Sequence, residues 1–167
     1  MVAESLCVAC LFEGEVALRN RLDLADMFGA RTLVLITGGF EDLAATGYSG
    51  GIEHARSLLI DRLGAAAELA ADHRVRLAFE PLHPMVCGFR SVVSSLGEAL
   101  VILDQLDDGH DIGLAIDAYA LWWEHDLQAK LMRAGDRILN YHVSDWLSDT
   151  RDLRLDRGMP GDGQIAL

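Results

Sequence analysis

The sequence predicts an α/β protein built around a parallel β-sheet. Short apolar stretches of strand character alternate with longer stretches of helical character about four times, and a fifth strand follows. The strand stretches are apolar on both faces, which is typical of parallel sheets that helices cover. An open doubly wound sheet and a piece of a (β/α) barrel both fit this order.

The first half of the chain predicts two such strand–helix units. SLCVACL (5–11) is an apolar strand, and EVALRNRLDLADMFG (15–29) is an amphipathic helix that stops at its glycine. TLVLITGG (32–39) is a strand that ends in a glycine pair. After a glycine-rich loop, the Ala- and Leu-rich stretch 52–73 predicts a long helix.

The second half continues the alternation. A strand over 76–80 leads into a loop with two prolines, and a helix over about 94–106 begins near a serine that can cap it. A strand over 111–117, a mostly helical stretch over 121–135 and a strand over 137–145 follow. The tail is expected to be a loop rich in Gly and Asp. No G-x-G-x-x-G follows the first strand, so a dinucleotide-binding sheet has no support.

Composition limits the class of protein. The 167 residues suffice for one domain over 1–167, and 51% hydrophobic with 24% charged residues is typical of a globular protein rather than a disordered one. A formal net charge of −12 disfavours binding to nucleic acid.

Targeting signals and disulfides are not expected. No apolar run approaches the roughly 18–20 residues of a membrane helix, and the N-terminus lacks the basic region of a signal peptide. Three cysteines form no even disulfide framework and favour a reducing, cytoplasmic location. Cys7 and Cys10 lie in a strand-like run, where we expect buried apolar cysteines rather than a redox pair.

Polar residues stand where several predicted strands end. Glu80 ends the third strand, Asp117 ends the fourth, and His142 lies on the fifth with Asp145 just after it. The carboxyl ends of parallel strands form one mouth, so these side chains are expected to converge there. Two carboxylates and an imidazole suit a divalent cation such as Mn²⁺, Mg²⁺, Co²⁺ or Zn²⁺.

Structural explanations for the same residues remain open. Asp117 can cap the following helix, and His142 can be a core histidine bonded to a backbone carbonyl. Glu80 can pair with Arg76 or Arg90. The spacing alone does not decide between these explanations and a metal site.

Residues near the strand ends are candidates for contact with a substrate. His83, in the loop after Glu80, either lines the pocket or is a solvated loop histidine. Trp122 or its neighbour Trp123 can stack on a sugar ring, although one of the two is expected to pack inward. Asp145 is expected to contact the substrate or to support a residue that does.

Four stretches resemble one known family. FEPLHP, DIGLAIDAYALWW, YHVSDWL and LDRGMPGDGQI, in this order, resemble the xylose-isomerase-like family of TIM barrels, and more narrowly its bacterial sugar phosphate isomerases/epimerases. FGARTLVLITGG and FRSVVSSLGEAL also look like the family pattern. The resemblance implies a partial (β/α) TIM barrel of about five parallel strands, similar to strands three to seven of the family barrel and truncated at both ends.

The resemblance also implies a reaction and a site. Glu80, Asp117 and His142 would hold a divalent metal ion, Arg157 would contact a small sugar substrate, and a proton would move between adjacent carbons through an enediolate. Glu80 would act as one member of an acid–base pair.

The sequence departs from the family in two ways. Ala120 stands where the family usually has a substrate-contacting His, and the second Glu of the metal shell would lie on a last strand that this sequence lacks. A full barrel needs about 250 residues. The chain can be a fragment of a longer protein, one part of a barrel that another chain completes, or a remnant that has kept the fold without the function. Unpaired strand edges favour a homo-oligomer that covers them.

Three functions are therefore kept at this point. The first is a metal-dependent sugar isomerase or epimerase. The second is a non-catalytic binding or assembly module of the same fold. The third, a DNA-repair nuclease of the related endonuclease-type barrel, is disfavoured by the acidic charge and the scarcity of His at strand ends.

Overall fold

Five parallel strands form a single curved sheet in the computed structural model, which describes residues 4–106 and 111–167. The strands are β1 (Ser5–Cys10), β2 (Thr32–Ile36), β3 (Arg76–Phe79), β4 (Ile112–Asp117) and β5 (Ile138–His142). Their order in the sheet is their order in the chain, whereas a doubly wound sheet reverses direction at a switch point. The fold is therefore a half-barrel, as the partial TIM-barrel prediction states.

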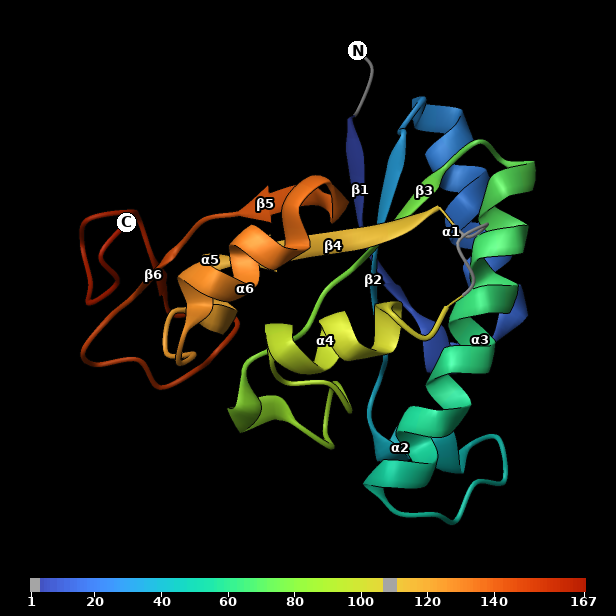
Figure 1. Ribbon diagram of the computed structural model, residues 1–167, viewed down its shortest axis with the longest axis horizontal. Helices are drawn as coiled ribbons and strands as arrows, with labels where there is room; N and C mark the ends of the chain where they lie inside the picture. Colours follow the sequence, from blue (N-terminus) through green and yellow to red (C-terminus); the bar gives the residue numbers. More distant parts are fainter. Residues whose placement is uncertain (1–3, 107–110) are drawn as a thin grey trace.

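Helices cover the outer, convex side of this sheet (Figure 1). Helix α1 (Glu15–Phe28) packs on β1 and β2, and the long α3 (Ile52–Asp72) packs on β3 and on α1. Helix α4 (Leu96–Leu103) contacts α6 (Leu127–Ala134). Gly29 ends α1 in the left-handed conformation (φ 66°) and donates its N–H to the Ala25 and Asp26 carbonyls, which confirms the glycine stop.

Several element boundaries differ from the prediction. The stretch 121–135 is two helices, because α5 (Ala118–Leu121) begins directly at the end of β4 and a turn separates it from α6. The predicted helix over 94–106 is shorter, with Ser95 as its N-cap. The glycine-rich loop contains a short α2 (Phe40–Ala44), which is capped when the Asp42 carboxylate accepts the Gly39 N–H.

The C-terminal tail was also predicted incorrectly as a plain loop. Its residues Arg157–Gly158 form β7, which pairs antiparallel with β6 (Asp145–Trp146), a strand that follows β5 after two residues. This small two-stranded sheet brings the tail back beside the end of β5. Short 3₁₀ turns occupy Leu11–Glu13, Pro84–Val86 and Gly135–Arg137.

Side chains alternate between two faces of the main sheet. Large residues of β2, β3 and β4 point outward into the main core beneath the helices, and these include Leu33, Leu35, Leu77, Phe79, Leu114 and Ile116. Smaller residues between them, Val34, Ala78 and Ala115, form a separate cluster on the inner face. This second cluster also contacts Val8 and Leu139 of the two edge strands.

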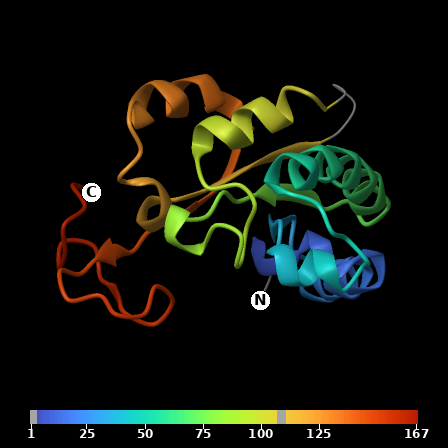
Figure 2. The same ribbon diagram turned by 90° about the horizontal axis from the view of Figure 1, so that it is seen from below.

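The main sheet curves (Figure 2), and side chains of its two edge strands are in contact. The Asn140 side-chain amide on β5 donates to the Ser5 hydroxyl on β1 at 2.8 Å. Cys7 and His142, each two residues further along the same strands, are also in contact. Consequently, residues from both edges of the half-barrel contribute to its interior.

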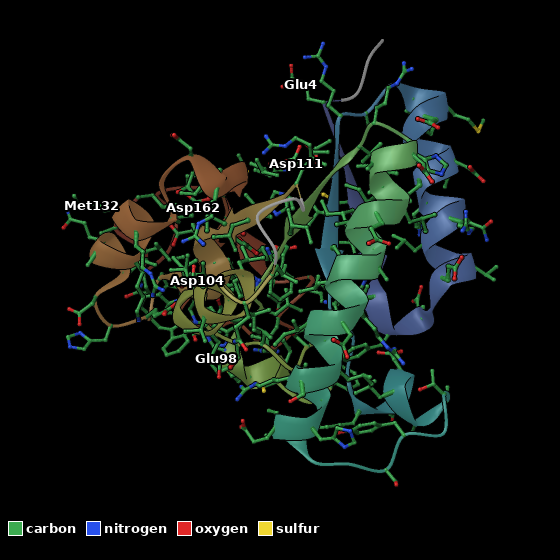
Figure 3. All side chains as sticks on the ribbon, turned by 45° about the vertical axis from the view of Figure 1, so that its right-hand side comes forward. Glu4, Glu98, Asp104, Asp111, Met132 and Asp162 are labelled. Carbon is green, nitrogen blue, oxygen red and sulfur yellow. The ribbon has the colours of Figure 1, made fainter. Side chains whose placement is uncertain are left out.

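Ion pairs at both ends of α4 connect the helices that flank it. Glu98 in the first turn pairs with Arg56 of α3. Asp104, labelled in Figure 3, lies at the opposite end and pairs with Arg133 of α6 and with Arg137 in the turn after it. Within the described residues, no helix has both the length and the apolar character that a membrane span requires.

Candidate functional site

The predicted strand-end residues lie on the inner face of the sheet at its C-terminal edge. Glu80 and Asp117 each stand two residues after an inner-face alanine, Ala78 and Ala115, so the alternation of a strand turns their side chains inward. His142 is the direct neighbour of Asp117 in the pairing of β4 with β5. Only 5% of Glu80 and 1% of Asp117 is exposed, so both carboxylates need nearby partners.

His142 is the partner of Glu80. The imidazole Nδ1 lies 3.2 Å from the Glu80 carboxylate, and Nε2 lies 3.6 Å from the sulfur of Cys7 on the opposite edge strand. The hydrogen bonds to Cys7 and to Glu80 raise the pKa of His142 to about 10, against the opposing effect of burial. A charged imidazolium therefore compensates the buried charge of Glu80, whereas Arg76 pairs with Asp111 instead.

Arg157 is the partner of Asp117. Its Nη1 donates to Asp117 Oδ2 at 2.8 Å, while Asp117 Oδ1 accepts the Tyr119 N–H at 3.0 Å as the N-cap of α5. The Arg157 guanidinium also lies 4.3 Å from the centre of the Tyr119 ring, in a cation–π contact. Asp117 thus has both the helix-capping contact considered from the sequence and a charged partner.

Asp145 organises the loop that carries Arg157. It is fully buried, and its two oxygens accept four backbone N–H groups, from Trp146, Gly161, Gly163 and Ile165, at 2.8–2.9 Å. These bonds, beginning with that from Ile165, lower the pKa of the carboxyl. Because both oxygens accept backbone N–H groups, Asp145 supports the loop that carries Arg157.

An aromatic cluster lies beside these ion pairs. Trp146 stacks on Tyr119 with ring centres 4.8 Å apart, and it contacts His83 at 4.9 Å and Trp122 at 6.0 Å. Burial lowers the pKa of His83, whose Nδ1 accepts the Met85 N–H. Trp122 remains 37% exposed, so part of this side chain is accessible to solvent.

The donor atoms are of the kinds that bind a divalent cation, but in this structure they are bonded to one another or to Arg157 and are not arranged around one ion. Two buried carboxylates and an imidazole are the oxygen and nitrogen ligands that Mn²⁺ and Zn²⁺ accept. Across residues 4–106 and 111–167, however, no group of three His, Cys, Asp or Glu side chains is arranged to hold a metal ion. Glu80 and His142 form one pair and Asp117 and Arg157 form another, so a cation would have to replace existing partners.

Two grooves of the described surface lie away from these residues. One of 580 Å³ runs along α1 and α3 and is lined by Leu18, Arg62 and Leu69 among others. A second of 430 Å³ lies between α3 and α4, at Arg56 and Val101. Neither is lined by a predicted site residue. They are grooves between outer helices, whereas the chemistry-bearing residues are at the strand ends.

Sequence reasoning missed two contributors to the site. Cys7 was expected to be buried and apolar, but it is exposed and contacts His142. Tyr119 was not considered, although its ring lies between Arg157 and Trp146. The position of Tyr119, two residues after the strand-end Asp117, was an available signal. No local pattern signals that the two edge strands meet.

Comparisons with known proteins agree with this architecture. Residues 16–167 match a family model described as xylose isomerase-like TIM barrel. A search of curated proteins found no match. Among solved structures, protein SMc04130 from Sinorhizobium meliloti 1021 is 38% identical, with a TM-score of 0.84 over 99% of this chain. The chain covers 62% of the length of that structure.

Two more distant structures share the fold. The IolI protein, determined with a binding zinc atom, is 19% identical with a TM-score of 0.67, over 90% of this chain and 51% of IolI. The 3-keto-D-glucoside 4-epimerase YcjR from E. coli is 16% identical with a TM-score of 0.65, over 87% of this chain and 59% of YcjR.

Proposed function

Because the chain belongs to the xylose isomerase-like TIM-barrel family, we propose that it provides the catalytic strand ends of a sugar, or sugar phosphate, isomerase or epimerase. The observation that carries this proposal is the placement of Glu80, Asp117 and His142 on one inner edge of the half-barrel. Active sites of (β/α) barrels lie at this edge.

In the proposed reaction, Glu80 takes the proton from the hydroxyl-bearing carbon next to a carbonyl group, which leaves an enediolate. For isomerisation the proton returns to the former carbonyl carbon while a hydroxyl proton passes between the two oxygens, and for epimerisation the second member of the acid–base pair delivers a proton to the opposite face of the same carbon. Its position favours this role, because Glu80 directly follows β3 on the inner face of the sheet, at the edge where active sites of (β/α) barrels lie. His142 holds Glu80 in position at 3.2 Å, and Trp122 offers an indole face for the ring or chain of a sugar.

Metal dependence is part of the proposal and is supported by a related structure. IolI contains zinc, and Glu80, Asp117 and His142 are the residues that would hold a divalent cation here. When bound, such an ion would polarise the carbonyl and hydroxyl oxygens of the substrate. The proton on the carbon next to the carbonyl group would then be easier to remove. YcjR, an epimerase of the same fold, is consistent with sugar chemistry.

Exchange of substrate protons with solvent tests this function. The protein is incubated in D₂O with Mn²⁺ or Co²⁺ and a panel of ketoses and ketose phosphates, and loss of the C–H signal beside the carbonyl is followed by proton NMR. We expect exchange with at least one sugar and a reduction of about 10²-fold or more in Glu80→Gln, the lower range for loss of a general base. Glu41→Gln, on the surface of α2, is the matched control.

The second candidate is a binding module without catalytic activity. Two observations favour it: the Asp117 carboxylate is already paired with Arg157, and Ala120 stands where the family usually has a substrate-contacting His. Saturable Mn²⁺ binding that disappears in Glu80→Gln, together with no proton exchange on any sugar of the panel, would favour this module over the enzyme.

A further inference from the structure

Glu124 is a buried carboxylate that the proposed reaction does not use. It lies in the turn between α5 and α6, directly after Trp122 and Trp123, and its side chain is 3% exposed. Its two oxygens accept the backbone N–H groups of Leu96 at 2.7 Å and Gly97 at 3.1 Å, the first two residues of α4. These N–H groups have no partner inside the helix, and the positive end of the helix dipole favours a carboxylate there. Glu124 therefore fastens the turn after α5 to the start of α4.

Lys130 of α6 completes this attachment. Its ammonium group donates to Glu124 Oε1 and to the His125 carbonyl, both at 2.7 Å, and its side chain is 30% exposed. A partly buried charge pair of this kind is screened by salt much less than a pair on the surface. Because the carboxylate bonds to α4 and to α6 at once, it fixes the turn against both helices.

The same turn carries two of the aromatic rings beside the ion pairs. The Trp123 indole N–H donates to the Ala120 carbonyl at 2.7 Å, and the Trp123 ring lies 6.0 Å from that of His83. The Trp122 ring lies 6.0 Å from that of Trp146. His83 belongs to the loop that leads from β3 into α4, whereas Trp122 and Trp123 follow β4. The spacing of these rings therefore depends on the bonds between the turn and the start of α4.

We propose that Glu124 is a positioning residue of the strand-end site: through its bonds to α4, it sets where Trp122 and Trp123 stand against His83 and Trp146. It acts through the indole rings, because both oxygens of its own carboxylate are bonded within the protein and its side chain is nearly inaccessible. Contact between these rings and a ligand rests on the proposed function, whereas the arrangement of the rings does not.

Tryptophan spectroscopy tests this role without a ligand, because all three tryptophans of the chain belong to the aromatic cluster. Near-ultraviolet circular dichroism and acrylamide quenching of fluorescence are compared for wild type and Glu124→Gln. The glutamine keeps one acceptor oxygen but has no charge for Lys130 or for the N-terminus of α4. We expect a loss of the tryptophan dichroism bands and stronger quenching, while far-ultraviolet circular dichroism keeps the helix signal.

Asp104→Asn is the matched control. Asp104 is a carboxylate at the opposite end of α4, where it pairs with Arg133 and Arg137, so this variant also weakens ion pairs that join α4 to its neighbours. Its tryptophan signals should equal those of wild type. Unchanged signals in Glu124→Gln, or the same change in both variants, would overturn the inference.

Lys130→Met keeps the test possible if Glu124→Gln does not fold. This variant removes the counter-charge but leaves the two backbone bonds of Glu124, so we expect a smaller change of the same tryptophan signals. Signals identical to those of wild type would then contradict the proposal.

The proton-exchange assay separates this inference from the proposed function. For any sugar that exchanges, Glu124→Gln should raise KM by about threefold or more, within the range of one aromatic contact, and leave kcat unchanged because Glu80 is intact. An unchanged KM would overturn the role in the reaction. Exchange with no sugar would overturn the proposed function, and the tryptophan signals alone would then decide whether Glu124 positions the rings.

Discussion

At the scale of single residues, the site is a set of charge pairs in a buried environment. Glu80 directly follows β3 as a nearly buried carboxylate, which would be costly without a partner. His142 provides the compensating charge, and Arg157 does the same for Asp117. The two carboxylates that resemble metal ligands are thus stabilised by the protein itself, which explains how the chain folds around them.

The ionisation of His142 can be tested directly. Since its folded pKa of about 10 lies above the ordinary value of 6.5, its contribution to stability is fully present below about pH 6.5 and is lost as the pH rises toward 10. We expect the imidazole NMR signals of the metal-free protein to titrate near pH 10, and Glu80→Gln to lower this midpoint. A wild-type midpoint near 6.5 would show that the pairs with Cys7 and Glu80 do not form in solution.

At the scale of elements, the close packing of β4 and β5 places Asp117 beside His142. Gly113 on β4 permits this approach, because a Cβ atom there would lie 2.2 Å from the Arg137 carbonyl oxygen and 2.5 Å from the Leu139 side chain. The register of the two strands shifts just after this point, between Leu114 and Ala115. Alignment of the two strand ends therefore depends on a residue without a side chain.

Substitution of this glycine should separate the strands. Gly113→Ala is expected to lower the free energy of unfolding by about 1–3 kcal/mol, the usual cost of overpacking, because a backbone carbonyl cannot move aside. Gly97→Ala is the control: its Cβ would make only ordinary contacts, with the Lys130 side chain at 3.4 Å and Glu124 Oε1 at 3.6 Å, and it lies inside α4, where Ala is favoured. Urea denaturation should show Gly97→Ala unchanged or stabilised; equal effects of the two variants would contradict the argument.

At the scale of the whole molecule, the half-barrel has two open edges. β1 and β5 each pair with one neighbour in the five-stranded sheet, and Tyr141 on β5 is 56% exposed. Unpaired strand edges with exposed apolar side chains favour association with another chain.

We therefore expect this chain to associate with itself. Sedimentation velocity should detect a species larger than the 18.2 kDa monomer, with a proportion that rises with protein concentration. Tyr141→Lys should weaken this association, because the charge would have to be buried in a joined edge. Met27→Lys, on the exposed side of α1, should have no effect. A monomer at every concentration would refute the prediction.

The sequence by itself determined the alternation of strands and helices and the positions of Glu80, Asp117 and His142 near the strand ends. Those features are local, because apolar runs, glycine stops and the period of a strand are set by residues a few positions apart. It missed α2 and β7, which depend on a single cap and on a pairing between distant segments.

Only the tertiary structure decided which groups pair with these residues. Arg157 meets Asp117 across 40 residues of sequence, and Cys7 meets His142 across 135. The first contact requires Asp145 to fold the tail back beside β5, and the second requires the sheet to curve until its edge strands touch. Both depend on the summed packing of the whole chain, which no short stretch of sequence records.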